Sequence, residues 1–103
     1  KPDLVFRKGK IAIGLAEVKY KPEIEEKDRY QVISHVVAAG CNLGVWISPS
    51  LPERFEGIEY VGAISNGAKF YHYQIDISGD LEVASSKMIE TIVPLLPQGS
   101  GLP

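Results

Sequence analysis

Residues 11–20 read Ile-Ala-Ile-Gly-Leu-Ala-Glu-Val-Lys-Tyr, and this stretch decides how the rest of the chain is interpreted. Its residues are apolar or glycine until Glu17, which is typical of a largely buried β-strand. Side chains of a strand alternate between the two faces of a sheet, so Glu17 and Lys19 are predicted to share a face. A carboxylate and an ammonium group at the end of such a strand are costly unless they are paired or hold a cation.

A second carboxylate is predicted to lie beside this pair. Residues 4–7 read as a short strand, and Gly9 lies in a tight turn at 7–10, so the two strands form a hairpin that brings Asp3 next to Glu17. Two carboxylates and a lysine at a sheet edge predict a site for a divalent metal ion and a phosphodiester. Oxygen atoms are the ligands that Mg²⁺ prefers, and Mn²⁺ is the alternative ion.

Each residue of this predicted site has an expected role. Asp3, Glu17 and the backbone carbonyl of Val18 are the predicted metal ligands. Lys19 is predicted to orient an attacking water or to stabilise the negative charge of the pentacovalent phosphate.

A crossover helix is predicted over residues 23–39. Acidic residues fill its first turn and Gly40 suits its end. One apolar stripe at helical spacing contains Tyr30, Ile33, Val36, Val37 and Gly40, and a second, more polar stripe contains Gln31, Ser34, His35 and Ala38. We expect this helix to be buried on most sides, so that Gln31 and His35 need polar partners.

The remaining elements complete an α/β fold with a mixed central sheet. A strand at 43–48 is expected to pair in parallel with the strand at 11–20, as the crossover helix requires. After a loop at 49–57, the Asn66-Gly67 pair predicts a second hairpin over 58–77. Asp80 is predicted to cap a C-terminal helix over 81–93, which Pro94 ends, and a tail follows at 97–101.

Composition limits the classes of function. The 103 residues predict one domain, no apolar run is long enough to span a membrane, and Cys41 is the single cysteine, which excludes an internal disulfide. We therefore expect a cytoplasmic protein without a membrane partner. The formal net charge of −2 is unlike that of a nucleic-acid-binding protein, although residues 1–29 hold eight Lys and Arg against six Asp and Glu.

The motifs resemble those of a known superfamily. Pro2-Asp3, followed after thirteen residues by Glu17-Val18-Lys19, resembles the signature of PD-(D/E)xK nucleases. Asp28-Arg29-Tyr30-Gln31 with His35 resembles the helical Gln-x-x-x-Tyr element of RecB-like and McrC-like nucleases, with His35 in the place of the Tyr. Together with Gly44-Val45-Trp46-Ile47, these motifs most resemble the C-terminal nuclease domain of McrC-type restriction subunits.

The resemblance covers residues 2–48, where the catalytic motifs fall, and it implies a restriction-endonuclease-like core. It implies a Mg²⁺-dependent endonuclease that hydrolyses DNA as the cleavage part of a modification-dependent restriction system. Asp3, Glu17, Lys19 and Gln31 would then be the catalytic residues. An NTP-driven motor subunit is the implied partner, and a homo-oligomer is an open alternative. Because the chain begins at Lys1, we expect it to be a fragment that lacks the upstream helix of many superfamily members.

Other readings of these residues remain open. Glu17 and Lys19 can form a surface ion pair on an edge strand, while His35 can lie on a solvated helix face or in the core. His72 is expected to be a structural histidine. The alternative function is a non-catalytic module of the same fold that docks to a partner or contacts DNA.

Overall fold

The computed structural model describes residues 2–21, 24–50 and 57–96. Its first two strands are β1 (Leu4–Lys8) and β2 (Ile11–Val18), which pair antiparallel as the sequence predicted. Gly9 has a φ of 63° in the turn between them, a conformation that glycine adopts without strain.

The chain then crosses over the sheet through helix α1 (Glu26–Ala39) to strand β3 (Leu43–Pro49). Gly40 ends α1 in a left-handed conformation with a φ of 69°. Strand β3 pairs in parallel with β2, which confirms the predicted crossover. Its first six residues are all buried, as expected for the middle strand of a sheet that is covered on both faces.

The second hairpin consists of β4 (Gly57–Ala63) and β5 (Lys69–Ile75), which pair antiparallel on either side of the Asn66-Gly67 turn. Strand β5 also pairs in parallel with β3, so the strand order is β1-β2-β3-β5-β4. Helix α2 (Leu81–Ile92) follows, and the side chain of Asp80 accepts hydrogen bonds from the backbone N–H groups of Glu82 and Val83. A short 3₁₀ helix, η1 (Val93–Leu95), contains Pro94.

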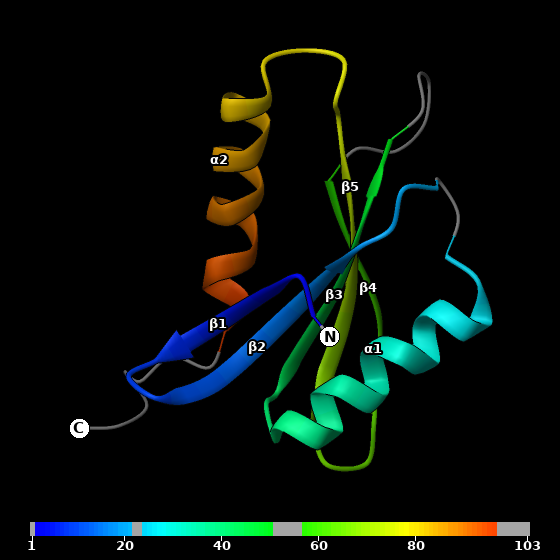
Figure 1. Cartoon of the computed structure of the whole chain (residues 1–103), viewed down its shortest axis with the longest axis vertical. Coiled ribbons are helices and arrows are strands. Elements are labelled where there is room, and N and C mark those ends of the chain that lie inside the picture. Colours follow the sequence, from blue (N-terminus) through cyan, green and yellow to red (C-terminus); the bar gives the residue numbers. More distant parts are fainter. Residues whose placement is uncertain (1, 22–23, 51–56, 97–103) are drawn as a thin grey trace.

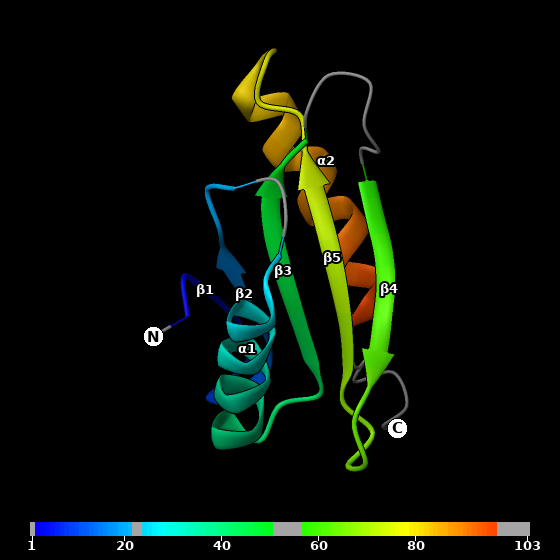
Figure 2. The ribbon, with the colours of Figure 1, turned by 90° about the vertical axis from the view of Figure 1, so that its right-hand side faces the viewer.

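The two helices lie on opposite faces of the sheet. Figure 1 shows α2 beside the sheet on one side and α1 on the other, and Figure 2 shows α1 in front of β2 with α2 behind β5. The protein is therefore an α/β protein with a five-stranded mixed sheet and two helices. Neither helix, within the described ranges, is long and apolar enough to cross a membrane.

Small residues on β2 face the C-terminal elements. A Cβ atom at Gly14 would lie 2.6 Å from Leu96 Cδ2, so a larger residue would require the Leu96 side chain to shift. Ala16 is fully buried in the same core, which also contains Leu43, Tyr73 and Ile92. This face of β2 is thus closely packed, and the residue nearest Gly14 belongs to the segment after η1.

A second core lies between the sheet and α1. Trp46 packs against Phe70 with 5.7 Å between the ring centroids, and Val32 and Val36 of α1 cover them. A Cβ atom at Gly44 would lie 2.8 Å from both Phe70 and Val36. Burial raises the pKa of the Cys41 thiol in this core, which agrees with an inert structural cysteine.

Two predictions about α1 were wrong. The helix begins at Glu26 rather than Glu23, because Glu25 acts as its N-cap in a capping box with Asp28. Residues 22–23 lie outside the described ranges, as do most of the predicted loop at 49–57 and the predicted tail. The buried positions are Asp28, Val32 and Val36. The helix is also not buried on most sides, because it covers only one part of one sheet face and leaves Tyr30 60% and Val37 53% exposed.

Candidate functional site

Polar side chains gather at the end of β2, on the face that α1 covers. Strands β2, β3 and β5 are parallel, so their carboxyl ends lie at one edge of the sheet. In open α/β sheets this edge is where ligands bind. Glu17 lies there on β2 and is only 3% exposed, and Lys19 follows two residues later on the same face.

Asp3 is brought to this edge by the β1–β2 hairpin. Leu4 pairs with Ala16, so Asp3 lies next to Glu17 at the open end of the ladder. The Val18 N–H donates to Asp3 Oδ2 at 2.8 Å. In an extended strand the N–H and C=O of one residue point to the same side, so the Val18 carbonyl also points toward β1 and Asp3. Asp3 thus contacts the backbone of Val18, the residue between Glu17 and Lys19.

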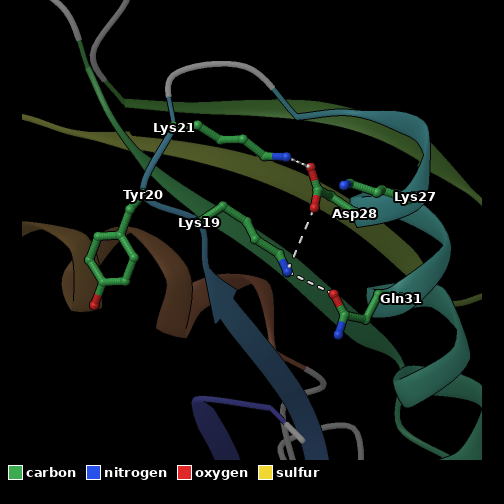
Figure 3. A pocket seen from close by; sticks show the side chains of 6 residues that line it. All are labelled: Lys19, Tyr20, Lys21, Lys27, Asp28 and Gln31. Carbon is green, nitrogen blue, oxygen red and sulfur yellow. Dashed lines mark hydrogen bonds and ion pairs between the residues drawn. The ribbon is translucent and has the colours of Figure 1, made fainter.

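The ammonium group of Lys19 is enclosed by polar side chains from β2 and α1. Its Nζ donates to Gln31 Oε1 at 2.7 Å. It also lies 3.8 Å from Glu17 Oε1 and 3.7 Å from Asp28 Oδ1. Figure 3 shows Lys19 pointing between Asp28 and Gln31. The predicted contact between Gln31 and this part of the chain is thus present, although the Gln31 residue as a whole is exposed.

His35 also reaches the site, which the sequence left open. Its Nδ1 is hydrogen-bonded to Glu17 Oε2, so α1 contacts both Glu17 of β2 and Lys19 directly after it. Spacing explains this arrangement, because Gln31 and His35 lie one helical turn apart and Glu17 and Lys19 lie two apart on a strand. The polar stripe of α1 thus meets the polar end of β2.

Asp28 is the member of the cluster that the sequence analysis did not assign to the site. Its carboxylate is buried between two lysines, with Lys21 Nζ 2.8 Å from Oδ2 and Lys19 Nζ on the other oxygen. Burial alone would raise the pKa of Asp28, but hydrogen bonds from Lys21 and from the Glu25 amide outweigh it and hold the pKa below its usual 3.8. The sequence signal that could have drawn attention to Asp28 is its capping-box spacing from Glu25, which marks the first turn of a helix.

An open hollow of about 710 Å³ lies over this cluster. It is lined by Lys19, Tyr20, Lys21, Lys27, Asp28 and Gln31. The ring of Tyr20 points away from Asp28 and Gln31 (Figure 3), so the polar wall is formed by the lysines, the carboxylate and the amide. A ligand that enters the hollow meets the ammonium group of Lys19.

Asp3, Glu17 and the Val18 carbonyl offer the types of oxygen donor that a hard divalent cation prefers. Mg²⁺ is often held by one or two carboxylates and keeps several waters, so two carboxylates and a carbonyl suffice. The described residues include no group of three or more His, Cys, Asp or Glu that could hold a metal ion, so a site built from such side chains alone is not formed there. His35 occupies one oxygen of Glu17 and leaves the other beside Lys19.

A separate polar pair lies further across the same sheet face. Ser48 Oγ and His72 Nε2 are joined by a hydrogen bond of 2.6 Å, and Ser48 is fully buried. Burial lowers the pKa of His72 from its usual 6.5; Glu59 opposes this effect and Arg29 adds to it. His72 is thus held in place by a side-chain partner, as the expectation of a structural histidine requires.

The protein should lose stability as the pH falls below 6.5 because of His72. The unfolded chain binds a proton at the usual pKa of 6.5, whereas the folded chain takes it up only at lower pH, so acid favours unfolding until the folded pKa is passed. Urea midpoints at pH 7.5 and about one to two units below 6.5 measure the effect, and in His72→Gln the decrease should be smaller. An equal decrease in both proteins would show that His72 does not cause it.

Comparisons of the chain with protein-family models, with curated proteins and with solved structures found no match. By its fold and its candidate site, this chain is an α/β protein with a polar cluster at the carboxyl ends of the parallel strands of a mixed sheet.

Proposed function

We propose that this chain is a Mg²⁺-dependent endonuclease that hydrolyses DNA phosphodiester bonds. The observation that supports this proposal most directly is the hydrogen bond from the Val18 N–H to Asp3 Oδ2, of length 2.8 Å. It places the Asp3 carboxylate beside the residue between Glu17 and Lys19. Two carboxylates and a lysine from adjoining strands then serve one reaction centre.

The roles follow from the contacts. Asp3, Glu17 and the Val18 carbonyl would hold Mg²⁺ or Mn²⁺, which when bound supplies Lewis-acid activation of the phosphate and of the attacking water. The Lys19 ammonium has three N–H donors, and Gln31 accepts one of them at 2.7 Å. Glu17 and Asp28 lie at ion-pair distances of 3.8 and 3.7 Å, so the other donors would turn from these carboxylates to phosphate oxygens as negative charge develops. His35 holds Glu17 in orientation through its Nδ1.

The spacing of these residues also supports the finer assignment. We propose a restriction-endonuclease-like core of the PD-(D/E)xK type, most similar to the nuclease domain of McrC-type restriction subunits. In that setting the protein acts in the cytoplasm, with an NTP-driven motor subunit or a second copy of itself as partner. DNA sequence would then be read by other parts of the assembly.

Supercoiled plasmid incubated with the protein tests the proposal. Nicked or linear DNA should form with Mg²⁺ and should not form with EDTA. Glu17→Gln keeps the size of the side chain but removes its charge, so we expect cleavage to fall by about 10²-fold or more. Glu59→Gln, on β4, is the matched control and should cut as the unmodified protein does. Cleavage that is unaffected by EDTA or by Glu17→Gln would contradict the proposal.

One observation favours the alternative function, a non-catalytic module for DNA contact or partner docking. Both charged groups of β2 already have internal partners, since Glu17 is bonded to His35 and Lys19 to Gln31. A satisfied network of this kind can serve the fold alone. DNA binding without any Mg²⁺-dependent cleavage would support this alternative over the nuclease.

A further inference from the structure

Lys21 lies outside the predicted catalytic set, yet it lies beside Lys19 on the hollow. Its Nζ is 2.8 Å from Asp28 Oδ2 and 3.6 Å from Glu25 Oε2. The side chain of Lys21 is 36% exposed and that of Asp28 only 6%. The Lys21 side chain is therefore partly exposed, while the Asp28 carboxylate that pairs with it is buried.

Asp28 holds Lys21 and Lys19 together. Its two carboxylate oxygens contact the two lysines separately, at 2.8 Å for Lys21 and 3.7 Å for Lys19. The carboxylate is itself fixed, because it accepts from the Glu25 N–H at 2.9 Å, and Trp46 Nε1 donates to the Asp28 carbonyl at 2.9 Å. Figure 3 shows both lysines directed at this one residue. The two ammonium groups are thus positioned as a pair.

Such a pair matches the chemistry of a phosphate backbone. An ammonium group has three N–H donors, and the bond to Asp28 leaves donors of Lys21 directed to the hollow. Lys27 adds a third cation at the rim, with its side chain 78% exposed and its Nζ 3.8 Å from Glu25. Because Asp28 is buried beneath the lysines, a phosphate that enters the hollow meets Lys19 and Lys21 before the Asp28 carboxylate. The exposed carboxylate at the rim is that of Glu25, whose side chain is 59% exposed and lies between Lys21 and Lys27. The hydrogen bond to Asp28 raises the pKa of Lys21 above 10.5, so Lys21 is charged at neutral pH.

We propose that Lys21, positioned by Asp28, binds a backbone phosphate of DNA next to the phosphate that Lys19 contacts. Lys21 is then a substrate-binding residue and Asp28 a positioning residue. The inference rests on the proposed function for the identity of the neighbouring phosphate. The contact itself is independent of cleavage and is measured by binding.

The test is the salt dependence of duplex DNA binding. Binding is measured by fluorescence anisotropy in the presence of EDTA, so that no cleavage occurs. Each neutralised phosphate contributes about 0.9 to the slope of log K against log salt concentration. Lys21→Gln should lower the slope by about 1 and weaken binding several-fold and equally for unrelated sequences. Lys21→Arg should restore the slope. Lys69→Gln, at the opposite end of the sheet, is the control and should leave both quantities unchanged.

Asp28→Asn tests the positioning role. It should weaken binding, and Lys21→Gln should have a smaller additional effect in that background than alone, because the two residues act together. Circular dichroism checks that each variant is folded. If Asp28→Asn does not fold, the Lys21 variants alone decide the phosphate contact.

The outcomes separate this inference from the nuclease proposal. If the unmodified protein cuts DNA with Mg²⁺ and Lys21→Gln has the same salt slope as the unmodified protein, the inference is overturned and the nuclease proposal stands. A protein that binds DNA through Lys21 and never cuts it supports the inference and contradicts the nuclease. A protein that binds no duplex DNA overturns the inference.

Discussion

Lys19→Ala is expected to abolish Mg²⁺-dependent DNA cleavage while the protein stays folded. The ammonium group lies at the end of β2 with Gln31 Oε1 at 2.7 Å and Glu17 Oε1 at 3.8 Å. Removing one donor that stabilises developing charge costs about 10²–10³-fold in rate, or roughly 3–4 kcal/mol. Initial rates of plasmid nicking measure the loss. Unfolding midpoints measure the stability, which should decrease because Lys19 lies beside the buried carboxylates of Glu17 and Asp28. The variant should still fold, since His35 and Lys21 keep their contacts with these two carboxylates.

Two variants make this result specific. Lys19→Arg keeps the charge but replaces a compact ammonium with a planar group, so it should recover only part of the rate. Lys69→Ala removes a lysine at the opposite end of the sheet, where β5 begins, and it should retain most of the cleavage. A folded Lys19→Ala protein that cuts as fast as the unmodified one would show that Lys19 has no catalytic role.

Local signals predicted most of the fold. The Asn66-Gly67 pair marks one turn and Gly9 the other, and both hairpins lie at these turns. Asp80 predicted the start of α2 because an N-cap acts on its own neighbouring amides. The insertion of β5 between β3 and β4 was not predicted, because strand order depends on contacts between residues far apart in the chain.

The face of α1 could not be predicted from its apolar residues. Tyr30 and Val37 have the helical spacing of a core stripe, yet both are exposed, while the charged Asp28 is buried. The tertiary contacts explain this, since Asp28 meets Lys19 and Lys21 from the end of β2. These partners satisfy its charge, and a helix can bury a carboxylate only where such partners exist. Which face of α1 is buried therefore depends on the sequence of α1 and on the lysines that follow β2.

The candidate site was predicted to a similar extent. The Asp3 carboxylate reaches the Val18 N–H at the end of β2 because a hairpin is a local structure with a fixed register. The partner of Glu17 was not assigned, because the bond to His35 depends on how α1 lies across β2. Asp28 was missed for the same reason. Sequence spacing predicts which residues share a strand or a helix, whereas contacts between the two depend on packing.

Trp46→Ala is expected to cause the largest loss of stability in this chain. Trp46 is 1% exposed and packs against Phe70 with the two rings tilted and 5.7 Å between their centroids. Its Nε1 donates to the Asp28 carbonyl at 2.9 Å, which attaches the first turn of α1 to β3. Truncating a buried Trp costs about 3–5 kcal/mol, which corresponds to a decrease in Tm of roughly 12–40 °C at this size. Thermal unfolding followed by circular dichroism measures it, because Trp46 is the only tryptophan available for fluorescence.

Trp46→Phe separates packing from the hydrogen bond. It keeps an aromatic ring against Phe70 and removes the donor to Asp28, so the loss should be smaller than in Trp46→Ala, at about 1–3 kcal/mol. The same variant should reduce DNA binding through Lys21, because the turn that carries Asp28 is then less firmly held. A Trp46→Ala protein that loses less than about 1 kcal/mol would mean that this ring does not anchor α1 to the sheet.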